Sequence, residues 1–187
     1  MTKRLTDFAL ALILFVILLV PLLFIALLVR LTSKGPAVHW SKRIGRNNEI
    51  YLMPKFRTMR IETPQVATHK LQNADNYLTP IGAFLRKTSI DELPQLWSVI
   101  AGQMSLVGPR PALFNQYDLM QLRTEKNVHL LKPGITGWAQ INGRDELPIP
   151  VKVEMDEYYL KKQSLLLDLK ILFLTVHKVS KSEGIKH

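Results

Sequence analysis

The chain has 187 residues, enough for one domain with a sizeable core, and it lacks cysteine, which excludes a disulfide framework and a cysteine-based zinc site. Its five histidines are scattered, so any metal would be a hard cation held by carboxylates. The net charge is +10, and residues 1–60 supply most of it, with ten Lys or Arg against two acidic residues around an apolar segment; this favours an anionic membrane surface, not nucleic acid, as the partner.

The apolar segment Phe8–Val29 contains 22 consecutive uncharged residues, enough to cross a bilayer. Lysine and arginine lie on both sides of it, and a straight span cannot keep both basic ends in the cytoplasm. Pro21 removes a backbone hydrogen bond within the segment and predicts a kink. The residues leave two hypotheses open: a re-entrant helix–break–helix hairpin over residues 1–34 with its bend near Pro21, or an ordinary single span. A cleaved signal peptide fits poorly, because no small-residue cleavage site follows.

The region after the apolar segment predicts a β-hairpin. Strands are expected over Val38–Ile44 and Glu49–Met53, because residues 45–48 are good turn formers, and Pro54 is expected to end the second strand. Three cations follow within residues 55–60, and this cluster is either a solvated basic face or a contact for phosphate groups.

Two adjacent carboxylates, Asp91 and Glu92, stand at the predicted start of a helix that ends near Gly102. Ser89 and Glu92 have the spacing of a capping box, which would place Asp91 in the first helical turn, where the helix dipole favours its ionised form. Because Pro94 is tolerated only near the first turn, Asp91 itself is the alternative cap, and either choice leaves it at the positive end of the helix. An ionised carboxylate among cations is a candidate nucleophile or metal ligand. A capped surface helix with acidic residues in its first turn explains the same pattern without a site.

The remaining chain predicts loops and helices around one further arginine. Glycine and two prolines make the loop that carries Arg110 rigid, which suits bidentate phosphate binding. Residues 132–144 contain three glycines and predict a tightly turned segment whose backbone can approach a ligand. Helices are expected over residues 114–126 and 152–162, and residues 165–176 predict either an amphipathic helix at a membrane interface or a core helix.

Several motifs occur in an order that resembles one family. They are Lys-Phe-Arg-Thr-Met at residues 55–59, Asp-Glu-Leu-Pro-Gln-Leu-Trp at 91–97, Ser-Leu-Val-Gly-Pro-Arg-Pro at 105–111, Lys-Pro-Gly-Ile-Thr-Gly-Trp-Ala-Gln-Ile-Asn-Gly-Arg at 132–144 and Asp-Glu-Tyr-Tyr at 156–159. With the N-terminal apolar hairpin, this arrangement resembles the bacterial sugar transferases known as monotopic phosphoglycosyl transferases, in their minimal form. The resemblance covers nearly the whole chain.

The resemblance implies an activity and a set of site residues. Members of this family transfer a sugar phosphate from a UDP-sugar to undecaprenyl phosphate and release UMP, in the first membrane step of a glycoconjugate pathway. By the resemblance, Asp91 is the nucleophile that forms a covalent phosphosugar intermediate, Glu92 completes the dyad, and Mg²⁺ is required, with Asp91 as its protein ligand. The cations expected to bind the phosphates are Lys55, Arg86, Arg110 and Arg144.

The resemblance also implies a place in the cell. It favours the re-entrant hairpin, so that residues 35–187 form a catalytic domain on the cytoplasmic face of the bacterial inner membrane, in contact with membrane lipids. The expected fold class is mostly α with a small β-hairpin (α+β), with amphipathic interfacial helices. Val20 precedes Pro21 where the family often has Ser, and Asp145 follows Arg144 where it often has Asn.

Experiments can distinguish two alternative functions from the phosphoglycosyl transferase. A metal-dependent glycosyltransferase would hold its cation on Asp91 and Glu92 without a covalent intermediate. A non-enzymatic, membrane-tethered adaptor would use the basic face for lipid headgroups, and it would tolerate Asp91→Asn. Neither the sugar nor the oligomeric state follows from the sequence.

Overall fold

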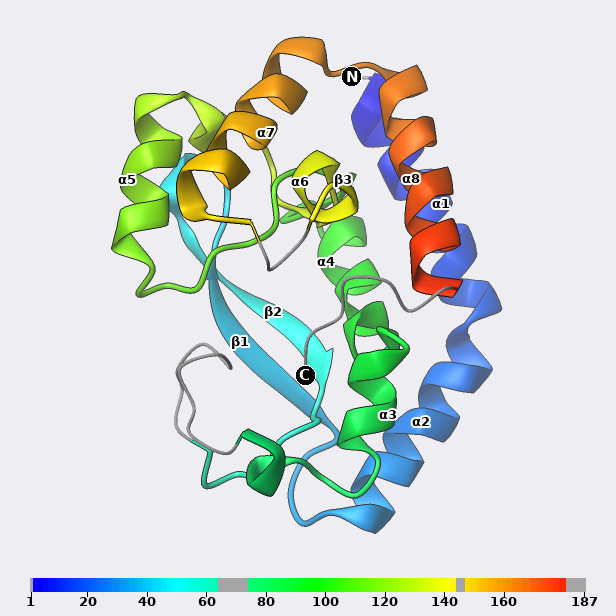
Figure 1. The fold of residues 1–187 in the computed structure, drawn as a ribbon. Helices are drawn as coiled ribbons and strands as arrows, with labels where there is room; N and C mark the ends of the chain where they lie inside the picture. The colour runs from blue at the N-terminus through cyan, green and yellow to red at the C-terminus, as the bar shows by residue number, and fades with distance from the viewer. Residues whose placement is uncertain (1, 64–73, 144–146, 181–187) are drawn as a thin grey trace.

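A computed structural model describes residues 2–63, 74–143 and 147–180, and its helices surround two small sheets (Figure 1). The α-helices are α1 (Thr2–Ile17), α2 (Leu19–Thr32), α3 (Gly82–Lys87), α4 (Leu96–Ile100), α5 (Tyr117–Glu125), α6 (Trp138–Ile141), α7 (Ile149–Lys162) and α8 (Leu165–Ser180). The 3₁₀ turns are η1 (Arg46–Asn48), η3 (Ala74–Tyr77), η4 (Ile90–Gln95) and η5 (Val128–Leu130). The strands are β1 (Val38–Ile44), β2 (Ile50–Phe56), β3 (Ser105–Val107) and β4 (Gly134–Thr136). The expected α+β class with a small hairpin is confirmed at this level.

The predicted hairpin is present, because β1 and β2 pair antiparallel from Val38 opposite Phe56 to Ile44 opposite Ile50. The prediction that Pro54 ends the second strand is wrong, since β2 continues through it to Phe56. Pro54 lies opposite Trp40 in a sheet of only two strands, where a residue without an N–H can be accommodated along an edge. The continuation carries Lys55 into the sheet.

The N-terminal apolar segment forms two helices that meet at a bend of 62°. The break is at Leu18, between α1 and α2, three residues before Pro21. Pro21 cannot donate to the carbonyl of Ile17 and crowds it, which explains a break at this point. Among the described helices none is by itself long and apolar enough to cross a membrane, whereas α1 and α2 together pass this test as a bent pair.

A second sheet, which the sequence did not predict, joins two short parallel strands, β3 and β4. Its backbones approach so closely that a Cβ atom on Gly134 would overlap the backbone of Gly108, and one on Gly137 would overlap the Gly108 carbonyl. The glycines of residues 132–144 were expected to allow close approach of a ligand. At these two positions they instead allow one backbone segment to pack on another.

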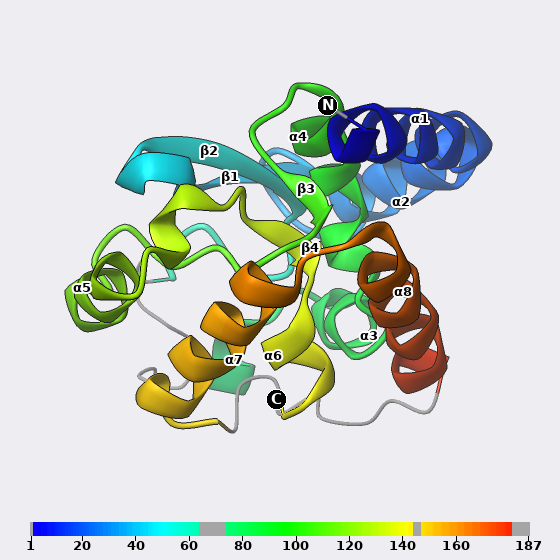
Figure 2. The same ribbon diagram turned by 90° about the horizontal axis from the view of Figure 1, so that it is seen from above.

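The core lies between the hairpin, the second sheet and the helices around them (Figure 2). Its largest cluster joins α1, α4, α7 and α8 through the buried side chains of Ala11, Val99, Tyr159 and Ile171. The predicted helices over residues 114–126, 152–162 and 165–176 are confirmed as α5, α7 and α8. Helix α8 turns one side inward and leaves large apolar side chains exposed on the other: Leu166, Leu169, Phe173 and Val176.

Candidate active site

Asp91 and Glu92 lie side by side on η4, which packs against β2, and both are about nine-tenths buried. The segment is helical as predicted, but its first turns are 3₁₀ and become α-helical only at Leu96. Pro94 inside η4 removes a donor and crowds the carbonyl four residues earlier, which disfavours α-helical closure there.

The predicted capping box is not formed. Ser89 adopts a left-handed conformation, with φ of 56°, and its hydroxyl is buried without a partner among the described residues. The Glu92 side chain points to cations instead of returning to the Ser89 backbone. The site is therefore held by tertiary contacts, and helix capping does not account for these two carboxylates.

Glu92 joins two of the predicted cations. Its Oε1 atom accepts hydrogen bonds from Lys55 Nζ at 2.7 Å and from Arg110 Nη2 at 3.2 Å. Lys55 comes from β2 and Arg110 from the loop after β3, so Glu92 links segments far apart in the sequence. The three side chains are mostly buried, and such charge-assisted bonds are about twice as strong as neutral ones.

Arg86 reaches the site from the last turn of α3, where its Nε atom donates to Thr58 Oγ1 at 2.9 Å. Helix α3 comes this close to Thr58 because residue 82 is glycine; a Cβ atom there would overlap the Thr58 carbonyl. Thr58 was not predicted as a site residue. The only feature of the sequence that pointed to it was its position within the Lys-Phe-Arg-Thr-Met motif.

Burial raises the pKa of the Asp91 carboxyl to about 6. The neighbouring charge of Glu92 also raises the pKa of Asp91, while Lys55, Arg86 and Arg110 oppose the shift. The sequence predicted that the helix dipole would favour the ionised form of Asp91. The structure differs, because desolvation outweighs the surrounding cations and raises the pKa of Asp91. Near neutral pH Asp91 is still mostly a carboxylate, and a buried carboxylate with a raised pKa is more basic than a solvated one.

Lys55 is subject to the same competition. Burial lowers the pKa of its ammonium group, and the charges of Arg110 and Arg43 lower it further, while Glu92 and Asp91 raise it. The two carboxylates therefore help to keep Lys55 charged in a buried position. The charge of Lys55 and the charges of the two carboxylates therefore stabilise one another in the buried cluster.

The face of the hairpin that carries Lys55 also carries His39 and Arg43, because alternate residues of β1 share a face and His39 pairs with Lys55. Arg43 donates from Nε to Ser41 Oγ at 3.0 Å and from Nη1 to the Pro111 carbonyl at 3.2 Å. Sequence reasoning missed His39 and Arg43. The alternation of residues along the predicted strand indicated that His39 and Arg43 share a face. The sequence did not give the pairing register, which is needed to place Lys55 on the same face.

The basic cluster of residues 55–60 does not act as one surface. Lys55 belongs to the site, whereas Arg57 is buried and donates to the carbonyls of Ser33, Lys34 and Gly35 at the end of α2. The sequence left two hypotheses for this cluster, a solvated basic face and a contact for phosphate groups, and the position of Arg57 fits neither. Arg57 binds the carbonyl groups of the three residues that follow the end of α2.

The structure brings five of the six predicted site residues together: Lys55, Arg86, Asp91, Glu92 and Arg110. Arg144 lies outside the described residues. Within the described ranges, no group of three or more His, Asp and Glu side chains is placed to hold a metal ion. Asp91 could still ligate Mg²⁺, because this ion is often bound by one or two carboxylates together with substrate phosphates and water.

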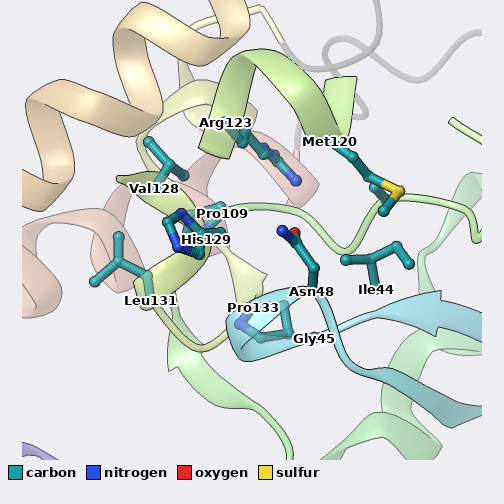
Figure 3. Close-up of a pocket in the computed structure, with 11 residues that line it drawn as sticks. Ile44, Gly45, Asn48, Pro109, Met120, Arg123, Val128, His129, Leu131 and Pro133 are labelled. Carbon is teal, nitrogen blue, oxygen red and sulfur yellow. The ribbon is translucent and has the colours of Figure 1, made fainter. Parts of the chain in front are cut away.

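A small pocket of about 20 Å³ lies behind the Arg110 loop and not at the carboxylates (Figure 3). Pro109, Arg123 and His129 are among its lining residues. This volume is close to that of a single water molecule. The pocket is too small for a sugar nucleotide.

Comparison with known proteins gives a consistent family. The sequence profile of the family described as "Bacterial sugar transferase" matches residues 1–182. An uncharacterized sugar transferase of Bacillus subtilis, EpsL, is 45% identical over 186 residues, which cover 98% of this chain and 90% of the relative.

Two further relatives carry names that state substrates. The UDP-glucose:undecaprenyl-phosphate glucose-1-phosphate transferase of Escherichia coli is 42% identical over 94% of this chain, and the match covers 39% of that protein. The UDP-galactose-lipid carrier transferase of Erwinia amylovora is 36% identical over 89% of this chain and 38% of the relative. The chain thus spans less than half the length of these two relatives but nearly the full length of the Bacillus protein.

Proposed function

Because the chain belongs to the bacterial sugar transferase family, we propose that it transfers a sugar 1-phosphate from a UDP-sugar to undecaprenyl phosphate and releases UMP. One observation carries this proposal: a buried carboxylate, Asp91, lies beside Glu92 in a cluster that holds Lys55, Arg86 and Arg110. A diphosphate substrate is anionic, and cations are needed to bring it against a carboxylate.

Asp91 is the proposed nucleophile. One carboxylate oxygen attacks the phosphorus that bears the sugar, the bond to the bridging oxygen of the diphosphate breaks, and UMP leaves with that electron pair. The acyl phosphosugar is then attacked by a phosphate oxygen of undecaprenyl phosphate, and the Asp91 carboxylate is released. The raised pKa of Asp91 suits this role, because the group stays ionised at neutral pH and gains basicity.

Glu92 is proposed to position cations and not to attack. Its Oε1 atom already binds Lys55 and Arg110, so it holds both charges next to Asp91. Lys55, Arg86 and Arg110 then stabilise the negative charge that spreads over the transferring phosphoryl group. Arg144, which lies outside the described residues, is a further proposed phosphate ligand.

The proposed cofactor is Mg²⁺, with Asp91 as the carboxylate that would hold it. When bound, the ion would supply charge neutralisation at the diphosphate and polarise its oxygens. A single protein carboxylate fits this ion, because magnesium is often held by one or two carboxylates together with substrate phosphates and water.

Both ends of the apolar segment are fixed to the same domain, which supports the proposed re-entrant hairpin. At the start of α1, Lys3 Nζ lies 2.6 Å from Asp168 Oδ2 on α8, and Asp7 accepts a hydrogen bond from Ser105 at 2.8 Å. At the end of α2, Arg57 holds the backbone of residues 33–35. A straight span would separate the start of α1 from this domain by the thickness of a bilayer.

The exposed apolar side of α8 supports placing the catalytic domain on the membrane surface. Leu166, Phe173 and Val176 are 80%, 74% and 71% exposed, and α8 is joined to the start of α1 by the ion pair between Lys3 and Asp168. Contiguous apolar side chains are unfavourable in free energy when they are exposed to water and favourable when they are buried at a lipid interface. We place the domain on the cytoplasmic leaflet, where UDP-sugars are available.

Trapping the intermediate tests the proposal. Purified protein with Mg²⁺ and a UDP-sugar, without lipid acceptor, should release about one UMP per protein and gain the mass of a phosphosugar on Asp91. UDP-glucose and UDP-galactose are the first donors to test, because relatives are named for each. Asp91→Asn should abolish both signals. A glycosyltransferase without a covalent intermediate would instead transfer sugar phosphate with no adduct, and an adaptor would release no UMP with any donor.

A further inference from the structure

The loop that carries Arg110 is held by hydrogen bonds to its backbone carbonyl groups. Pro109 and Pro111 have no N–H, so the loop depends on its carbonyl groups for anchoring. Each of the four consecutive carbonyl oxygens of residues 109–112 accepts a hydrogen bond. The donors, in order, are Gly134 N at 2.9 Å, Arg123 Nη1 at 2.8 Å, Arg43 Nη1 at 3.2 Å and Ile44 N at 3.0 Å.

Arg123 differs from the other donors because a buried carboxylate holds it. Its Nε and Nη2 atoms donate to Asp156 Oδ2 at 3.0 and 2.6 Å, and its third nitrogen, Nη1, reaches the Arg110 carbonyl. Arg123 is 8% exposed and Asp156 is 2% exposed. A guanidinium group has a planar fork of donors that can serve two acceptors at fixed angles.

A continuous series of contacts therefore runs from α7 to the carboxylates. Asp156 on α7 fixes Arg123 on α5, Arg123 fixes the backbone of Arg110, and the Arg110 side chain reaches Glu92 at 3.2 Å. Figure 3 shows Arg123 beside Pro109 on the side of the loop that faces the small pocket. A buried ion pair contributes little to stability on balance, since desolvation offsets its attraction.

We propose that Arg123, held by Asp156, is a positioning residue that fixes the Arg110 loop so that the Arg110 guanidinium reaches the site. The inference rests on the proposed function, because the readout is formation of the proposed phosphosugar adduct on Asp91. It adds a role for two residues that lie away from the reacting groups and belong to other helices.

Arg123→Lys separates positioning from packing. Lysine keeps a positive charge for the buried Asp156 carboxylate, so no ion is left unpaired. Its single ammonium group lacks the fork that serves Asp156 and the Arg110 carbonyl at once. The rate of adduct formation with a UDP-sugar, followed over hours so that slow variants are measurable, should fall by about tenfold.

A double-mutant cycle with Arg110→Ala decides whether this loss acts through Arg110. Once the Arg110 side chain is gone, Arg123→Lys should change the remaining rate by less than about twofold. An equal loss in both backgrounds, or no loss in either, would overturn the proposal. Arg57→Lys is the matched control, because Arg57 is also buried and donates to backbone carbonyls, but at the end of α2. Its effect should be the same in both backgrounds.

The double variant Arg123→Leu/Asp156→Leu protects the test against misfolding. It removes both buried charges, which is often neutral or favourable for stability, and it also removes the bond to the Arg110 carbonyl. A folded double variant should show the same loss of rate as Arg123→Lys, and a wild-type rate would contradict positioning. If the wild-type protein releases no UMP with any donor, the proposed function fails; if only the coupling is missing, the positioning role alone fails.

Discussion

The ammonium group of Lys55 lies 2.7 Å from the carboxylate of Glu92, across the contact between the β-hairpin and the turn that carries Asp91. The side chains are 17% and 11% exposed, so each charge depends on the other for compensation. Glu92 therefore has a structural explanation within the site that does not require it to react.

Glu92→Gln should slow the reaction without preventing the adduct on Asp91. The amide keeps the shape of the side chain but no longer compensates Lys55 and Arg110, so we expect UMP release to fall by about tenfold to a hundredfold. Intact-mass measurement should still find the phosphosugar adduct at long times. A folded Glu92→Gln protein that never forms the adduct would contradict a purely positioning role.

Asp91→Asn should inactivate the protein and stabilise its fold. The pKa of Asp91 is raised to about 6 by burial, so the ionised carboxylate destabilises the native state above that pH, and this cost is absent below the unfolded value of 3.8. The amide does not ionise. We expect Asp91→Asn to be up to about 3 kcal/mol more stable than wild type at pH 7.5 in metal-free buffer. The gain should shrink as the pH falls from 6 to 4. Denaturant unfolding across this range measures it, and a gain independent of pH would contradict the raised pKa.

Much of the site could be predicted from the sequence because its residues belong to short motifs with their own chemistry. The hairpin followed from strand alternation and turn residues, and the carboxylate pair followed from its place among cations and helix signals. The predicted capping box failed for a physical reason: Glu92 gains more from two buried cations than from a backbone N–H, and Ser89 adopts a left-handed conformation. Local spacing could not reveal these tertiary partners.

The second sheet and the anchors of the Arg110 loop could not be predicted for a related reason. Strands β3 and β4 have three residues each, too short to show alternation, and they pair across 29 positions from Ser105 to Gly134. Arg123 and Asp156 look like ordinary polar residues on α5 and α7 until the helices are packed together. Non-local pairing of this kind has no signature at the level of single segments.

Gly134→Ala should destabilise the fold through backbone overlap. A Cβ atom at this position would lie well inside contact distance of the Gly108 backbone, so β3 and β4 would have to separate. We expect a loss of about 2–3 kcal/mol, or a decrease in Tm of several degrees. Gly45→Ala is the control, since its Cβ would meet no atom closer than 3.1 Å. Equal Tm values for the two variants would show that the approach of Gly108 and Gly134 is not required.

Phe173→Glu should impair the step that uses the lipid acceptor. Phe173 is 74% exposed on the apolar side of α8, and placing a carboxylate at a lipid interface forfeits roughly 2 kcal/mol of burial in addition to repelling anionic lipids. In anionic vesicles that contain undecaprenyl phosphate, turnover should fall by about tenfold, whereas adduct formation without acceptor should be unchanged.

Tyr117→Glu is the matched control for this variant. Tyr117 is 70% exposed on α5, which lies on the opposite side of the molecule from α8 (Figure 1). Its turnover in vesicles should remain close to wild type. If both substitutions lower turnover equally, α8 has no special relation to the membrane.

A labelling experiment on single cysteines can determine the topology of the apolar segment, because the chain has no cysteine of its own. Thr2→Cys lies at the start of α1, Gln121→Cys on α5 and Val20→Cys next to the bend, and all three positions are exposed on the protein. In sealed, inverted bacterial inner-membrane vesicles, a re-entrant hairpin places Thr2→Cys and Gln121→Cys on the accessible side, so a membrane-impermeant maleimide should label both. Val20→Cys should react only after detergent is added, because lipid covers it.

A straight span predicts that Thr2→Cys is protected in the lumen while Gln121→Cys reacts, and that result would overturn the hairpin. The contacts of Lys3 with Asp168 and of Asp7 with Ser105 are the physical reason to expect the first outcome, since those bonds cannot form across a bilayer.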